Sequence, residues 1–163
     1  MLDAILFYCF AGLALAAAVG VVAQKNPILS ALSLIVTLCS LSAIFGLLGS
    51  PFIAALQIIV YAGAIMVLFL FVLMLLNVPR REEGEGRGIL KGVAVLLGVL
   101  FLVQVGAVIS VHGQGAPPAG YEATTQSVAR LLFSARFLYA FEATSVLILS
   151  ALVGAVALAK KEL

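Results

Sequence analysis

The sequence predicts an all-α membrane protein, a bundle of five transmembrane helices that forms one integral membrane domain over residues 1–163. Composition is the first observation behind this prediction: 64% of the residues are apolar and 10% are charged, against about 45–50% and 25% in ordinary globular domains. Charge placement is the second, because residues 26–79 contain no Asp, Glu, Lys, Arg or His. That run can cross a bilayer twice at about 20 residues per helix. A soluble fold and a disordered chain are both excluded.

Five apolar segments are long enough to cross a membrane, and turn-forming or charged residues separate them. The five spans cover residues 2–23, 28–48, 52–76, 89–111 and 137–159. Gln24–Pro27 breaks the chain after the first span, and Gly49–Pro51 forms the next turn, with a proline at a favourable helix start. A charged, glycine-rich loop over residues 77–88 follows the third span. A linker over residues 112–136, rich in Gly and Pro, precedes the fifth.

The last part of that linker, residues 126–136, carries apolar residues at helical spacing, flanked by Arg130 and Arg136. This pattern fits a short interfacial helix that leads into the membrane. It fits equally well an extension of the fifth helix beyond the bilayer. The sequence leaves these two interpretations open.

The distribution of Lys and Arg predicts the direction of insertion. With five spans, seven of the nine basic residues fall on one side of the membrane and two on the other. The seven are Lys25, Arg80, Arg81, Arg87, Lys91, Lys160 and Lys161, and the two are Arg130 and Arg136. In the inner (plasma) membrane of a bacterium, this split places the N-terminus outside and the C-terminus in the cytoplasm. The loop 77–88 is then cytoplasmic and the linker 112–136 lies outside.

Few side chains offer chemistry of their own. The sequence holds no CxxC or Cys/His pair with metal-ligand spacing, no Walker loop, no GxGxxG and no HExxH. We therefore predict no catalytic residue and no metal site in this chain. Basic patches with interleaved aromatic residues are absent, so no nucleic-acid partner is expected. Cys9 and Cys39 lie in apolar runs and are interpreted as small buried side chains.

Small residues recur every four positions in the first and fifth spans, which predicts close helix packing, because lipid offers no hydrophobic drive for helices to associate. These residues are Gly12, Ala16 and Gly20 in the first span and Ala151, Ala155 and Ala159 in the fifth. The helices are expected to pack against each other, against lipid and against other membrane chains.

Polar groups at membrane depth are few and mark the candidate site. Glu142 is the only acid well inside an apolar run, near the start of the fifth span, where it fits either a polar partner or the membrane interface. In the third span, Gln57 and Tyr61 are four residues apart and share a helix face. Gly63 follows and costs about 1 kcal/mol relative to alanine in a helix interior. It fits close packing against another helix, or a change of winding to a π-bulge.

The third span also carries a resemblance to a known family. The run ALQIIVYAGAIMVLFLFVLMLLN, residues 55–77, resembles the signature of the subunit J and chain 6 family of proton-pumping NADH–quinone oxidoreductases, or complex I. The resemblance extends to the five spans, the charged loop after the third, and the ending that starts at Phe141-Glu142. Residues 84–125 match only in pattern. Many relatives have Pro where Ala140 stands here.

The resemblance implies a function for the whole complex rather than for this chain alone. The complex passes electrons from NADH to a quinone and moves protons outward across the membrane. The resemblance implies that this chain is a non-catalytic subunit with no cofactor of its own. Flavin mononucleotide and iron–sulfur clusters belong to other subunits, and neighbouring subunits bind the quinone. The expected partners are the small membrane subunits A, K and H and an antiporter-like subunit.

The resemblance also implies a site. In relatives the third helix can hold a π-bulge at the tyrosine–glycine region, which here falls on Tyr61 and Gly63, with Val60, Ala64 and Met66 around them. Winding and unwinding there is linked to opening a water path toward acids of neighbouring subunits. Gln57 and Glu142 are expected to give polar support.

Two other functions are considered. A purely structural scaffold for a membrane complex is the alternative to gating of a water path by the third helix. A transporter working alone is disfavoured, because the spans carry no paired charges.

Overall fold

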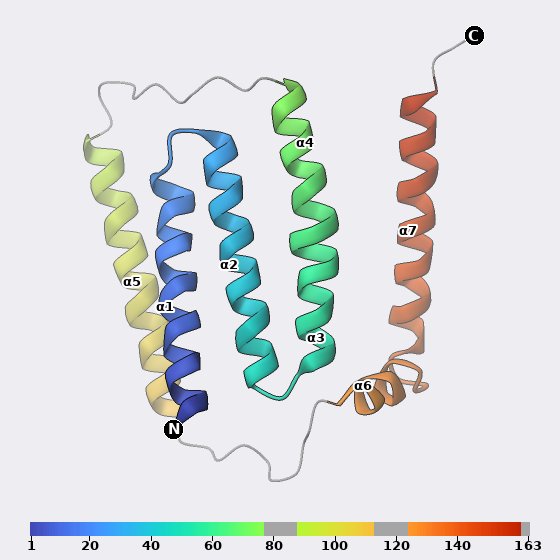
Figure 1. Ribbon diagram of the computed structural model, residues 1–163, viewed down its shortest axis with the longest axis horizontal. Coiled ribbons are helices and arrows are strands. Elements are labelled where there is room, and N and C mark those ends of the chain that lie inside the picture. Colours follow the sequence, from blue (N-terminus) through green and yellow to red (C-terminus); the bar gives the residue numbers. More distant parts are fainter. Residues whose placement is uncertain (77–87, 113–123, 161–163) are drawn as a thin grey trace.

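The computed structural model describes residues 1–76, 88–112 and 124–160, and these residues form helices and short connections with no strand (Figure 1). The elements are α1 (Leu2–Ala23), α2 (Pro27–Leu47), α3 (Pro51–Leu56), η1 (Gln57–Ile65), α4 (Met66–Leu76), α5 (Gly88–His112), α6 (Thr125–Leu132) and α7 (Leu138–Ala159). The third span is the continuous run α3–η1–α4, in which η1 is a π-helix. Within these described residues, five helices are long and apolar enough to cross a membrane, which confirms the predicted all-α membrane fold with five spans.

The predicted span limits agree with the helices to within one residue at each end. The second helix runs over residues 27–47 rather than 28–48, and the third span starts at Pro51. The fourth runs over residues 88–112 and the fifth starts at Leu138. The predicted charged loop lies outside the described residues except for Gly88, and linker residues 113–123 also lie outside them.

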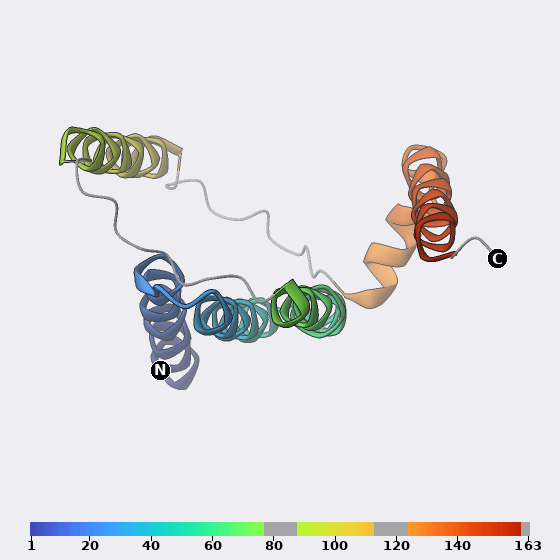
Figure 2. The ribbon, with the colours of Figure 1, turned by 90° about the horizontal axis from the view of Figure 1, so that it is seen from above.

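Helix α2 is the centre of a layer of three neighbouring spans. It packs against α1 on one side and against α3, η1 and α4 on the other, as the view from above shows (Figure 2). Helices α5 and α7 stand apart from this layer (Figures 1 and 2). The chain therefore forms its own helix contacts mainly within residues 2–76.

Helices α1 and α2 approach each other closely, through polar groups, at the end where the chain connects them. The Asn26 side chain accepts a hydrogen bond from Ile28 N–H (3.0 Å) and caps α2, which begins at Pro27. Ser30 Oγ of α2 donates to the Val21 carbonyl of α1 at 2.6 Å. A Cβ built on Gly20 would lie 3.3 Å from Ser33 Oγ, so the small residue permits this close approach.

The turn between α2 and α3 fixes where the third span begins. Gly49 has φ +75°, a left-handed conformation that glycine adopts without steric cost. Ser50 N–H donates to the Phe45 carbonyl (3.0 Å) and Gly49 N–H to the Gly46 carbonyl (3.2 Å). These two bonds form a Schellman motif, which satisfies carbonyls that the end of α2 leaves free. Pro51 then starts α3 at the first helical position.

The structure decides between the two interpretations of residues 126–136, because α6 is a separate helix. The Thr124 side chain accepts from Ser127 N–H (3.3 Å) and caps α6, which ends at Leu132. A short turn follows, and α7 begins at Leu138 in a different direction (Figure 1). The rings of Phe133 and Phe141 meet edge to face at 5.0 Å, so the turn packs against the first turns of α7.

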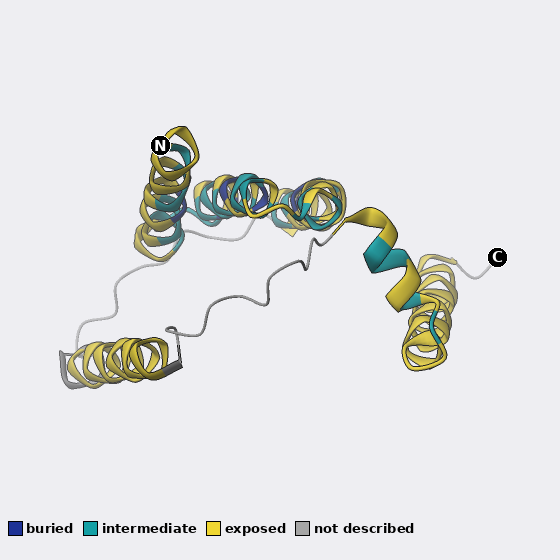
Figure 3. Ribbon diagram, turned by 90° about the horizontal axis from the view of Figure 1, so that it is seen from below, coloured by how far each residue is buried: buried dark blue, intermediate teal, exposed yellow. Residues whose placement is uncertain are grey.

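Little of the described chain is buried within the chain itself (Figure 3). The buried residues are Ala14, Ala31, Ser40, Ser42, Ala62 and Met66. Cys9 and Cys39 are exposed, so the prediction that both are buried is wrong for the chain alone. The physical reason is that an apolar side chain in a bilayer loses nothing by facing lipid or a partner chain.

Only part of the predicted small-residue stripes of the first and fifth spans forms helix contacts within the chain. Gly20 packs against Ser33, but a Cβ on Gly12 would meet nothing within 4 Å, and Ala16 is exposed. The alanines of the fifth-span stripe, on α7, are also exposed. These surfaces remain open on the chain by itself.

Candidate functional site

The centre of the third span is wound as a π-helix over the nine residues Gln57–Ile65. At its end, Met66 N–H donates to the carbonyls of Tyr61 and Gly63, five and three residues earlier, where an α-helix would use the residue four earlier. The prediction of a π-bulge in the third helix is therefore confirmed. The segment starts four residues before Tyr61, so it is longer on its N-terminal side than the sequence indicated.

Gly63 makes room for the change of winding. A Cβ built on Gly63 would lie 3.1 Å from the Ile58 carbonyl oxygen, five residues earlier, which is tighter than most real Cβ contacts. Glycine leaves this space to the backbone. The β-branched run Ile58–Val60 precedes it, but the similar run Ile35–Thr37 lies within the regular α-helix α2, so β-branching alone does not account for the change of winding.

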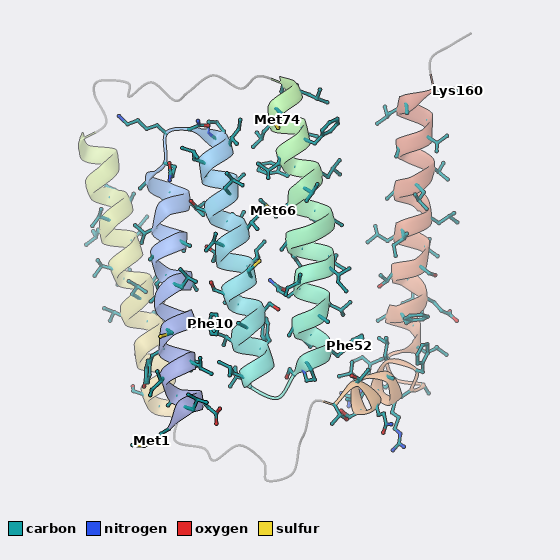
Figure 4. All side chains as sticks on the ribbon, viewed as in Figure 1. Met1, Phe10, Phe52, Met66, Met74 and Lys160 are labelled. Carbon is teal, nitrogen blue, oxygen red and sulfur yellow. The ribbon has the colours of Figure 1, made fainter. Side chains whose placement is uncertain are left out.

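The predicted site residues do not share one face. Met66 is 5% exposed and lies on the side of the span that faces α2 (Figure 4). Val60 and Tyr61 are exposed, Tyr61 by 52%, and Ala64 is exposed as well. Gly63 is half-buried. The π-helical segment thus has one side in the chain's own core and another side open to whatever surrounds the chain.

Sequence reasoning missed two residues that help to hold this segment. Ala62 is buried at 6% exposure, four residues before Met66, and η1 packs on α2. Ser42 of α2 is buried at 2% exposure and donates a hydrogen bond to the Ala54 carbonyl of α3 at 2.7 Å. Small or hydroxyl residues inside an apolar run were the available signal, but many such residues occur in this sequence.

The side chains of the three predicted polar residues, Gln57, Tyr61 and Glu142, form no hydrogen bond within the described part of the chain. Gln57 is half-buried and Tyr61 is exposed. Glu142 is exposed in the second turn of α7, a helix that stands apart from the third span (Figures 1 and 2). The structure therefore does not bring Glu142 to the π-helical segment.

An open cavity of about 260 Å³ lies beside α4, on the C-terminal side of the π-helical segment. It is lined by Val21, Pro27, Ser30, Ala31, Leu34, Phe69 and Leu73, from the ends of α1 and α2 and from α4. The lining is almost entirely apolar. Among the residues that the structure describes, no three of the types His, Cys, Asp and Glu gather where they could hold a metal ion.

The five apolar spans, with a π-helix at the centre of the third, define a multi-pass helical membrane protein whose distinguishing feature is a change of winding at membrane depth. A family model described as NADH-ubiquinone/plastoquinone oxidoreductase chain 6 matches residues 17–158. The chain belongs to this family of NADH–quinone oxidoreductase membrane subunits.

Individual relatives align with this chain over almost its whole length. NADH-quinone oxidoreductase subunit J of Pseudomonas aeruginosa is 38% identical over 160 residues, covering 96% of both chains. Subunit J of Escherichia coli K12 is 38% identical over 161 residues, covering 96% of this chain and 86% of the relative. NADH-ubiquinone oxidoreductase chain 6 of Marchantia polymorpha is 33% identical over 170 residues, covering 94% and 85%.

Proposed function

We propose that this chain helps to couple quinone reduction to proton translocation in a proton-pumping NADH–quinone oxidoreductase, and that its third span gates a water path. The observation that carries the proposal is the π-helix Gln57–Ile65 at the centre of that span. Reversion of a π-helical segment to α winding exchanges one set of backbone hydrogen bonds for another and repositions the helix that follows it. A helix with two available windings can act as a switch.

The effect of rewinding follows from helix geometry. Removing the extra residue of a π-bulge turns the downstream helix by roughly 100° and moves it by about 1.5 Å. Val67, Leu68 and Phe71 of α4 are all more than half exposed and would swing relative to Gln57 and Tyr61. Bulky apolar side chains exclude water, so moving them can open or close a hydrated path without any proton passing through this chain.

The proposal assigns the redox chemistry to other subunits. Flavin mononucleotide and iron–sulfur clusters would lie outside this chain, and neighbouring subunits would bind the quinone. We propose the small membrane subunits A, K and H and an antiporter-like subunit as the direct partners. The exposed surfaces of α5 and α7 and the open side of η1 are the surfaces available to them (Figure 3).

The alternative function is a scaffold that only holds subunits together. Structures of the assembled complex at rest and during turnover separate the two functions. A gate requires that Gln57–Ile65 is π-helical in one state and α-helical in another. If the segment keeps the same winding and the same orientation in every state, the gate is wrong and the scaffold explains the chain.

The proposed location is the inner membrane of a bacterium, with the N-terminus outside and the C-terminus in the cytoplasm. The supporting observation is the seven-to-two split of basic residues, several of which lie outside the described residues. We expect a cysteine placed at Gly86, in a background without Cys9 and Cys39, to react with an impermeant reagent only from the cytoplasmic side. Labelling from outside intact cells would reverse the proposed topology.

Glu142 is proposed to support proton transfer rather than to carry it, because α7 offers no second acid among its described residues. Replacing Glu142 by Gln should lower the pumping rate about two- to fivefold, the effect of losing one polar neighbour worth about 0.5–1 kcal/mol. Proton uptake by membrane vesicles measures this, with Glu142→Asp as the charge-conserving control. Complete loss of pumping in a fully assembled Glu142→Gln complex would mean that Glu142 carries protons itself.

A further inference from the structure

The third span is hydrogen-bonded to α2 on only one side of its π-helical segment. On the N-terminal side, Ser42 Oγ donates to the Ala54 carbonyl of α3 at 2.7 Å. Ser42 is 2% exposed, so little water competes for this bond. Among the described residues, no side-chain hydrogen bond joins α2 to η1 or α4. There the contact with α2 is apolar and involves the buried residues Ala62 and Met66.

Backbone hydrogen bonds reinforce the fixed side. Ala54 N–H donates to the Ser50 carbonyl (3.0 Å), and Ser50 N–H donates to the Phe45 carbonyl at the end of α2 (3.0 Å). The Ala54 carbonyl also accepts from Gln57 N–H, the first residue of η1. Residues 50–54 are therefore tied to α2 through the turn and through Ser42, directly before the winding changes.

Helix α4, which follows the π-helical segment, has room to move. Phe69 and Leu73 of α4 line the open cavity of about 260 Å³ between α4 and the ends of α1 and α2. A rotation of α4 would shift these side chains, and the buried Met66 with them, within apolar surroundings and would break no hydrogen bond to α2 in the described part of the chain. The two halves of the third span thus differ in how strongly they are held.

We propose that Ser42 is a positioning residue that holds α3 against α2, so that any change of winding in η1 turns α4 and leaves α3 in place. This inference rests on the proposed gating function and adds which half of the span moves. Losing one residue of π winding produces a rotation of roughly 100° and a shift of about 1.5 Å. With α3 held, α4 alone undergoes this movement. Without the bond, both halves would share the rotation and α4 would turn less.

The neighbouring hydroxyl groups of α2 show that the bond to Ala54 is particular to Ser42. Ser40 is equally buried, at 2% exposure, but its Oγ donates to the Val36 carbonyl of its own helix at 2.8 Å. Thr37 Oγ1 likewise donates within α2, to the Ser33 carbonyl at 3.0 Å. Ser40 is therefore a matched control: the same substitution at the same burial removes no bond to the third span.

The test compares Ser42→Ala and Ser40→Ala in the assembled complex. We expect both complexes to assemble. In Ser42→Ala, α3 is no longer held by this bond, so α3 should share the rotation, α4 should turn through a smaller angle, and protons translocated per NADH oxidised should fall. Ser40→Ala should keep the normal ratio, and Ser42→Thr, which retains the hydroxyl, should restore it. If Ser42→Ala prevents assembly, Ser42→Cys, which is close in size but a weaker donor, replaces it in the same comparison.

Structures of the unmodified complex in two states give an independent readout. The inference requires that α3 keeps its position against α2 and the Ser42–Ala54 bond while α4 rotates. Rotation of α3 with α4 in place would overturn the role of Ser42 and leave the gate intact. Equal proton ratios for the Ser42→Ala and Ser40→Ala complexes would also overturn it. Unchanged winding of η1 in all states would instead remove the gate itself.

Discussion

Replacing Gly63 by valine is expected to reduce both quinone-linked NADH oxidation and proton pumping at least about fivefold while the complex still assembles. The added Cβ would lie 3.1 Å from the Ile58 carbonyl oxygen in the π-helical form, and this neighbour is backbone that cannot rotate away. Overpacking of this kind costs about 1–3 kcal/mol. The substitution therefore disfavours the π form and holds the third span in α winding. Membrane vesicles that report NADH oxidation and proton uptake together measure the effect.

Two further variants make this prediction specific. Gly63→Ala adds only the Cβ and should give a smaller loss in the same direction. Gly98→Val introduces the same side chain at a glycine within α5, outside the third span, where a Cβ would meet nothing within 4 Å in this chain, and should leave the winding of the third span unchanged. Normal pumping by Gly63→Val, with an α-helical third span in its structure, would show that the change of winding is not required.

Expression of the chain without the rest of the complex is expected to give a protein that is degraded or that aggregates. Helices α5 and α7 stand apart from the α1–α2–third-span layer, and the small-residue stripe of α7 is exposed (Figure 3). The steady-state level should be several-fold lower than in cells that make the whole complex, because unassembled chains are removed by proteases. Immunoblotting of membranes from the two strains measures this level.

The state of the solubilised chain gives the second readout for this prediction. In mild detergent, the chain expressed alone should elute as mixed aggregates in size-exclusion chromatography, while the same chain in the complex elutes with NADH oxidation activity. A stable monomer with a sharp elution profile would contradict the prediction. It would show that α5 and α7 need no partner to hold their positions.

The sequence by itself determined the five spans and placed their limits to within one residue. A bilayer requires a long uninterrupted apolar run for each crossing, and the breaks are marked by Gln24–Pro27, Gly49–Pro51 and charged residues. It also indicated the region of changed winding through Gly63, together with the family resemblance of residues 55–77. The start of the π-helical segment at Gln57 was not predictable, because the register of backbone hydrogen bonds over a whole turn depends on how the span packs.

Only the tertiary structure decided which groups face one another. Ser40 and Ser42 are two residues apart in the same apolar run, yet one donates within α2 and the other to α3. A serine in a helix can always reach a carbonyl of its own preceding turn, so its residue type does not reveal a bond to another helix. The packing of α3 against α2 makes that choice. Met66 faces the core and Tyr61 faces outward for the same reason: the π winding and the contact with α2 together set the orientation of each side chain.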